Sequence, residues 1–529
     1  MFTFIKKMII NLLPQERRVF YAAIVVFILA AISRTTIAIR ENTEFIPVSG
    51  GVYREGIIGQ PVYVNPIISS NQTDIDIAAL IYSPLKQFIE NYEIQDNGKS
   101  YIVILKEKLF WSDGQPLTSD DVVFTIHLIQ DPETQSPLFN NWQGINVERL
   151  SEIKLKFMLS TPYVFFAEQL NRLPIIPKHI FGDIPSANLK LSKYNLEPKV
   201  SSGPYFFESF SKKDNGFITE YRLLNNKYYS GPEPYIKKFI FKFYENENDL
   251  LKAFQLRKID GFGILKPLNF NNEFIPKNSL IHTINMPRTY ALFLNSKINP
   301  FLKDKKIRQA LDEAINKEEL LEFIFGHNNQ IQSQQEKNQI TNSSSLAKLI
   351  EKNKNNFELT IILPDIDFLK KTAEFIQQSW QKAGIYKVNT IELPANELIN
   401  DIIRYRKYEI LLFGQILETP QDPFPLWHSS QGFHPGLNFS IYENKKVDEL
   451  IEKSRQEFRE NIRLNQLKEI EKLIVEDKPI IPLYTLPYTY VHFEKLRGFG
   501  NKELITNPAQ RFENVTEWYT KAVRVIKNK

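Results

Sequence analysis

Acidic residues and histidines are the side chains in this sequence whose spacing could support chemistry. Asp120 and Asp121 are adjacent, so on a helix they would point about 100° apart, which suits a capped first turn rather than an acid and base pair. His428 and His434 are not accompanied by an H-E-x-x-H pattern, so we expect no metal site. Asp422 precedes a proline and could form an Asx turn or offer a carboxylate to a cationic ligand.

Motifs of several enzyme classes are missing from the sequence. It contains no G-x-S-x-G elbow, no Walker loop and no dinucleotide fingerprint. It also contains no cysteine, which excludes disulfides, thiolate nucleophiles, cysteine-ligated zinc and a lipid-modified cysteine. We therefore predict that the chain is not an enzyme and needs no cofactor.

The segment 111–125, WSDGQPLTSDDVVFT, carries the clearest local structural signals. An alternating strand over 101–105 leads towards Asp113 and Gly114, a pair that favours a turn. Thr118 can cap a helix, and Asp121 three residues later completes a capping box. The segment predicts a strand, a turn and a capped helix over 122–129.

Length and charge restrict the class of protein. A chain of 529 residues with 43% hydrophobic residues should form two or three domains. The net charge of +5 is spread over 66 basic and 61 acidic side chains, so we expect no nucleic-acid partner.

The first forty residues contain an uncharged, apolar run over 19–33. This run is shorter than the roughly 20 residues of a usual membrane span, but snorkelling of Arg18 and Arg34 could extend it. We expect an uncleaved anchor within 1–40 that places the rest of the chain outside the cytoplasm. A cleaved signal peptide and a buried core helix are the alternatives.

The rest of the chain alternates between strand-like and helix-like segments. A strand over 357–363, a helix over 368–383 and a strand over 386–393 predict a βαβ unit. One long helix with an apolar stripe is expected from 447 until Pro479, and the polar tract 327–356 is expected to be an exposed loop. The alternation favours α/β lobes with partly parallel sheets.

As a whole, the segment 111–125 resembles the tryptophan-serine-aspartate-glycine signature of extracytoplasmic solute-binding protein family 5, the oligopeptide- and dipeptide-binding proteins of ABC importers. Further stretches are similar to the same family: 61–85, 173–180, 202–205, 307–316, 438–450 and 477–484. The resemblance implies a type II periplasmic-binding fold with two lobes, a hinge and an extra small domain. The tract 327–356 departs from the family pattern.

The resemblance also implies a division of the chain. We expect the anchor or signal segment over 1–40, a discontinuous lobe I over 46–82, 198–283 and 491–521, a small extra domain over 83–197, and lobe II over 284–490.

The family's ligand would lie extended between the lobes, with Ser70 to Gln72 on one side and Gly414 to Leu417 on the other. Glu418 is the first candidate to bind the peptide ammonium, where the family carries an aspartate, and Asp422 is the second. Trp427 could wall a side-chain pocket or belong to the core. The predicted peptide-binding residues are Ser70, Asn71, Gln72, Gln415, Ile416, Leu417, Glu418, Asp422 and Trp427.

The resemblance implies capture of short peptides and their delivery to ABC permease subunits that work with cytoplasmic ATPases. The protein would be a monomer, anchored in the cell membrane with its binding domain on the periplasmic side. The same fold could instead hold an oligosaccharide, nickel or haem. An anchored peptide sensor or chaperone without transport is a further alternative.

Overall fold

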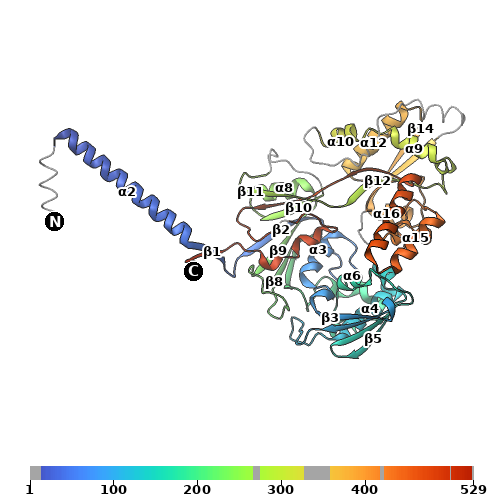
Figure 1. Ribbon diagram of the computed structural model, residues 1–529, viewed down its shortest axis with the longest axis horizontal. Coiled ribbons are helices and arrows are strands. Elements are labelled where there is room, and N and C mark those ends of the chain that lie inside the picture. Colours follow the sequence, from blue (N-terminus) through green and yellow to red (C-terminus); the bar gives the residue numbers. More distant parts are fainter. Residues whose placement is uncertain are drawn as a thin grey trace.

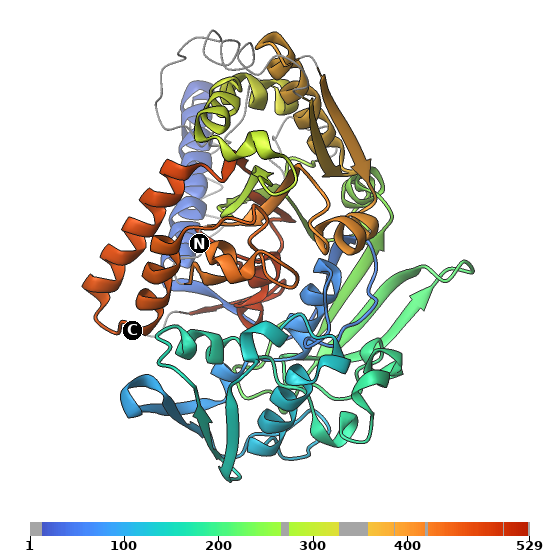
Figure 2. The same cartoon turned by 90° about the vertical axis from the view of Figure 1, so that its right-hand side faces the viewer.

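The computed structural model describes residues 13–265, 275–326, 358–385, 387–417, 422–500 and 502–526, and Figures 1 and 2 show it from two sides. Within this part of the chain the strands form one seven-stranded, one five-stranded and one four-stranded sheet and a two-stranded ribbon. The predicted tract 327–356 lies outside the described residues.

The seven-stranded sheet has the order β11-β17-β10-β2-β9-β8-β7. Its strands are β2 (Val52–Ile58), β7 (Tyr205–Lys212), β8 (Ile218–Asn225), β9 (Lys238–Tyr244), β10 (Gly261–Ile264), β11 (Ser279–Ile284) and β17 (Tyr488–Phe493). β2 runs parallel to β9 and β10, and the other pairs are antiparallel. Helices α3 (Gln72–Ile81) and α8 (Glu247–Gln255) belong to the same region.

The four-stranded sheet is antiparallel with the order β3-β4-β6-β5. Its strands are β3 (Ile89–Gln95), β4 (Ser100–Leu105), β5 (Asn146–Ser151) and β6 (Lys154–Met158). The helices near it are α4 (Ser119–Gln130), α5 (Phe139–Trp142), α6 (Phe166–Asn171) and α7 (Lys178–Phe181). This sheet shares one continuous hydrophobic core with the seven-stranded sheet.

The capped helix predicted from the segment 111–125 is confirmed. Gly114 has φ +86°, and Thr118 caps α4 in a capping box with Asp121. The Asp121 carboxylate accepts hydrogen bonds from the Thr118 backbone N–H at 3.0 Å and from the indole of the fully buried Trp111 at 3.3 Å. The Asp121 carboxylate therefore stabilises both the N-terminus of α4 and the position of the buried Trp111 ring.

The five-stranded sheet has the order β14-β13-β15-β12-β16. Its strands are β12 (Arg288–Leu294), β13 (Glu358–Pro364), β14 (Lys387–Leu393), β15 (Ile410–Ile416) and β16 (Ile480–Thr485). β13 and β14 are parallel and flank α12 (Asp367–Lys382), which confirms the predicted βαβ unit. The other helices of this part are α9 (Lys305–Glu313), α10 (Lys317–Phe325), α13 (Ala395–Glu397), α14 (Phe424–Trp427), α15 (Lys445–Gln456) and α16 (Glu460–Asp477).

The single long helix expected from 447 to Pro479 is wrong, because α15 and α16 are separate helices that lie side by side (Figure 2). Glu457 is extended at the break, and its carboxylate accepts a hydrogen bond from the Arg459 backbone N–H at 2.9 Å. Both helices direct apolar residues into the same cluster, including Val447 and Ile474. Folding back buries the stripe against itself and the sheet, which a straight helix could not do.

The N-terminal part projects away from the sheets. Helix α2 (Pro14–Asn42) is long and apolar enough to cross a membrane, and none of its most apolar stretch is buried (Figure 1). The helix is thus longer than the apolar run over 19–33. Strand β1 (Thr43–Pro47) follows and pairs with β18 (Ala522–Ile526) near the other end of the chain.

Candidate functional site

Two short segments connect the seven-stranded and five-stranded sheets. One joins β11, which ends at Ile284, to β12, and the other joins β16, which ends at Thr485, to β17. Ile284 pairs with Tyr488 on one side, and Thr289 pairs with Thr485 on the other. The two connections therefore run next to each other, an arrangement that suits a hinge between two bodies. One body contains the seven-stranded and four-stranded sheets, and the other contains the five-stranded sheet.

The N-terminus of α3 holds the first group of predicted site residues. Asn71 caps the helix, because its side-chain oxygen accepts a hydrogen bond from the Asp74 N–H at 2.9 Å. The Gln72 amide donates to Asp76 at 2.7 Å and to Asn507 at 3.0 Å, whereas Ser70 is exposed. Since the Asn71 and Gln72 side chains have intramolecular partners, the backbone and Ser70 are the parts best placed to meet a ligand.

A buried ionic cluster fixes the base of this helix. The Arg511 guanidinium donates to Glu55 at 2.9 Å and to Asp76 at 2.7 Å, and the Tyr490 hydroxyl donates to Glu55 at 2.8 Å. Burial raises the pKa of the Glu55 carboxyl, and the nearby Arg511 charge lowers it. The cluster ties β2, α3 and the segment around 511 together, so it positions the residues at the start of α3.

The end of β15 holds the second group. Ile416 packs against the core of the seven-stranded and four-stranded sheets, whereas Leu417 packs against the cluster under α15 and α16. The Gln415 amide donates to the Leu437 carbonyl at 3.0 Å. A Cβ atom on Gly414 would lie 2.6 Å from the Tyr290 ring, so any larger residue there would force that ring to move. The end of β15 therefore lies at the boundary between the two bodies.

Two of the predicted site residues, Glu418 and Trp427, follow β15 in the sequence, and the structure describes only the second. Glu418 lies outside the described residues. Trp427 is 9% exposed and packs edge-to-face with Tyr442 in a hydrophobic cluster, which is the position that the core interpretation predicts.

Asp422 takes part in a bridge that we call the Asp422 bridge, formed by Tyr163, Asp422 and Arg455. The Tyr163 hydroxyl donates to the Asp422 carboxylate at 2.8 Å, and Arg455 Nε lies 3.1 Å from the same oxygen. The Arg455 guanidinium also lies over the Tyr163 ring at 4.6 Å, and its backbone carbonyl accepts from Val164 at 2.8 Å. Burial raises the pKa of Tyr163 and Asp422 raises it further, so the hydroxyl remains a donor.

The Asp422 bridge connects the region of the four-stranded sheet to α15 without a covalent link. Its other Asp422 oxygen accepts from the Phe424 backbone N–H at 3.1 Å, which is the predicted Asx turn. An incoming ammonium at Asp422 would compete with Arg455 for the carboxylate. Tyr163 and Arg455 were not predicted as functional residues, and no local sequence signal marks them, because each acts on a partner distant in sequence.

The His428 side chain packs against protein groups near it in the sequence. His428 stacks on Phe424 with a centroid separation of 4.4 Å, and its Nδ1 lies 2.8 Å from Ser430 Oγ. Across the part of the chain that the structure describes, no three metal-ligating side chains gather into a possible site.

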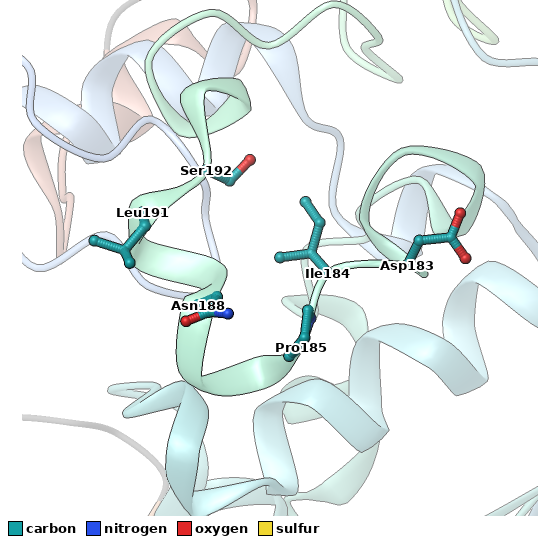
Figure 3. A pocket seen from close by; sticks show the side chains of 6 residues that line it. All are labelled: Asp183, Ile184, Pro185, Asn188, Leu191 and Ser192. Atoms are coloured by element: carbon teal, nitrogen blue, oxygen red, sulfur yellow. The ribbon is translucent and has the colours of Figure 1, made fainter.

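An open hollow lies on the surface in the segment that follows α7 (Figure 3). It is lined by Asp183, Ile184, Pro185, Asn188, Leu191 and Ser192. None of the predicted site residues contributes to it.

Comparisons with known proteins place this geometry in context. Residues 84–435 match the model of the bacterial extracellular solute-binding proteins, family 5. The oligopeptide-binding protein AppA of Bacillus subtilis is 23% identical over 514 residues, covering 89% of this chain and 92% of AppA. Its structure in complex with a nonapeptide has a TM-score of 0.75 and covers 90% of this chain and 99% of that chain.

Two further solved structures show the same architecture. The ABC transporter substrate-binding protein CtaP of Listeria monocytogenes is 26% identical with a TM-score of 0.75, covering 89% of this chain and 100% of CtaP. NikZ of Campylobacter jejuni, in complex with Ni(L-His), is 23% identical with a TM-score of 0.72, covering 88% of this chain and 99% of NikZ.

Proposed function

Because the chain belongs to the bacterial extracellular solute-binding proteins of family 5, we propose that it captures short peptides between its lobes and delivers them to the permease of an ABC importer. The observation that carries the proposal is the similarity over nearly the whole chain to AppA, whose structure holds a nonapeptide. The family and the solved structures confirm the predicted α/β type II periplasmic-binding fold. A binding protein, rather than an enzyme, is also what the relatives indicate.

The boundary at the end of β15 suits an extended ligand. A peptide backbone carries unpaired N–H and C=O groups, which a strand end and a helix N-terminus can satisfy regardless of the side chains. The ends of β15 and of the loop before α3 supply such groups from two different bodies. Binding between them would favour the closed form of the protein, because the ligand would contact both bodies at once.

We keep Glu418 as the residue that binds the peptide ammonium. Asp422 is the weaker candidate, because Arg455 and Tyr163 already compensate its charge. Glu418→Ala should weaken peptide binding more than about tenfold, since an ammonium in a desolvated cleft would lose its counter-charge. Isothermal calorimetry with the bound peptide checks this, and unchanged affinity would remove Glu418 from the site.

The proposed division of the chain into lobes, small domain and anchor follows the boundaries expected from the sequence. Helix α2 supports the anchor, because it is long and apolar enough to span a membrane and none of its most apolar stretch is buried. The lobes would then lie on the periplasmic side and meet the permease there, with the ATPases on the cytoplasmic side. The protein would act as a monomer.

Mass spectrometry of small molecules that co-purify with the protein tests the proposal. A ladder of short peptides, depleted in Glu418→Ala purified in parallel, is the expected result. Recovery of a sugar, haem or nickel complex in place of peptides would overturn the peptide assignment. Peptides that bind the protein but are not taken up by cells through a cognate permease would favour the sensor or chaperone alternative.

A further inference from the structure

The feature that the peptide site leaves unexplained is the ribbon of β1 and β18, here called the foot. Its register runs from Thr43 opposite Ile526 to Pro47 opposite Ala522, and the Val48 N–H then donates to the Lys521 carbonyl at 3.1 Å. No other strand of the described residues pairs with either of them. The foot therefore lies where α2 meets the body, with the C-terminus beside it (Figure 1).

The position of the foot relative to a bilayer follows from α2, and this step rests on the proposed anchor. The helix ends at Asn42 and β1 begins at Thr43, with no loop between them. If roughly 20 residues from Val19 cross the hydrocarbon, the span ends near Ala38. Only about one further helical turn separates that point from the foot, so the foot lies at the level of the lipid headgroups.

The foot exposes large apolar side chains on both of its faces. Phe45 is 55% exposed and Ile526 is 77% exposed, and the opposed pair Ile46 and Val523 are 42% and 47% exposed. Side chains directly opposite each other in an antiparallel pair share a face, so Ile46 and Val523 form one apolar pair. A solvent-exposed two-stranded sheet with this composition favours contact with another apolar phase.

Two basic side chains lie beside one of these apolar residues, Phe45. The guanidinium of Arg524 lies 5.4 Å from the Phe45 ring centroid, and that of Arg497 lies 5.6 Å from it. Arg524 Nε also donates to Thr43 Oγ1 at 2.7 Å, which holds it against β1. Guanidinium groups beside exposed aromatic and aliphatic side chains match a layer of anionic phosphates above acyl chains.

We propose that the foot docks into the headgroup layer and binds anionic phospholipids through Arg497 and Arg524. Its apolar residues then reach the acyl boundary, while β18 couples the end of the chain to the anchor. Docking at two points, α2 and the foot, fixes the height and tilt of the lobes above the membrane. Helix α2 alone would fix neither the height nor the tilt of the lobes.

The test uses the full-length protein in lipid nanodiscs. Because the chain has no cysteine, Val523→Cys provides a single site for an environment-sensitive fluorophore, and Leu191→Cys provides a control site that is exposed on the body. Nanodiscs contain a headgroup nitroxide quencher in either phosphatidylcholine alone or a mixture with phosphatidylglycerol. Quenching at position 523 should clearly exceed that at 191, and more so with the anionic lipid.

Variants that remove one positive charge then distinguish specific binding of anionic lipid from mere closeness of the foot to the membrane. Each of Arg497→Gln and Arg524→Gln should reduce association of the foot with the anionic surface about fivefold, with little effect in phosphatidylcholine. Arg404→Gln is the matched control. Arg404 also lies over an aromatic ring, that of Tyr405, but it belongs to the region of the five-stranded sheet and not to the foot. Equal quenching at 523 and 191, or no dependence on anionic lipid, would overturn the proposal.

Three controls keep the outcomes distinct. Resistance of the protein to carbonate extraction tests the anchor itself, and peptide affinity in the same nanodiscs tests the proposed function. Energy transfer between labelled copies at 523 without lipid quenching would show that a second copy covers the foot instead, which would contradict membrane docking.

Discussion

Tyr163→Phe is expected to weaken ligand binding from a position that need not touch the ligand. The change removes the hydroxyl that donates to Asp422 at 2.8 Å and leaves the ring under Arg455. A hydrogen bond to a charged group contributes about 1.5–3 kcal/mol, and we take the lower value because Tyr163 is only half-buried. If the Asp422 bridge forms when the lobes close, the ratio of closed to open protein falls roughly tenfold.

Both closure and affinity can be measured. Fluorophores on introduced cysteines at the exposed positions Leu191 and Lys445 report the distance between the four-stranded region and α15. Calorimetry with the co-purified peptide should show a dissociation constant about tenfold higher, provided that the free protein is mainly open. Tyr205→Phe is the matched control, because that hydroxyl donates to the Ile236 carbonyl at 3.1 Å within one body.

The result that would refute this reasoning is an unchanged distance distribution together with an unchanged dissociation constant in Tyr163→Phe. A similar loss of affinity in Tyr205→Phe would also refute it, because the effect would then be a general loss of stability.

Three further predictions concern stability. Arg511→Met should lower the free energy of unfolding by about 3–5 kcal/mol in urea titrations, because it leaves two buried carboxylates unpaired, and adding Glu55→Gln should recover part of the loss. Burial lowers the pKa of His492 to about 4, so its stabilising contribution is complete above about pH 6.5 and is lost as the pH falls towards 4. The cost between pH 7 and 4.5 should be about 2 kcal/mol and should disappear in His492→Gln, and an equal acid loss in the variant would contradict the assignment. Thr118→Ala should cost about 1 kcal/mol through loss of the α4 cap, and Thr118→Ser should restore it.

Local signals predicted local structure well. The turn at Gly114 and the cap at Thr118 depend on residues within a few positions, so the sequence contains nearly all the information that they need. The same holds for the βαβ unit around α12, where periodicity and the stop at Gly384 delimit each element. The family resemblance supplied the hinge and the boundary at β15, which no periodicity indicates.

Contacts between distant segments could not be predicted. Arg511 joins Glu55 and Asp76 only after three separate segments assemble, and a lone arginine in a sequence predicts a solvated side chain. The break between α15 and α16 was missed because the apolar period continues on both sides of Glu457. Asn71 was predicted to face a ligand, yet Asp74 three residues later is a capping pattern that was available in the sequence.

The pairing of β1 with β18 has a consequence for how the protein is made. β1 covers residues 43–47, but its partner lies at 522–526, so β1 has no partner until all the residues between them have been synthesised. At ordinary rates of synthesis this delay is on the order of a minute. Throughout that time helix α2 is attached to a body whose two-stranded ribbon is incomplete. Only a chain that already includes residues 522–526 can close the ribbon, so the attachment of α2 to the body is coupled to the synthesis of β18.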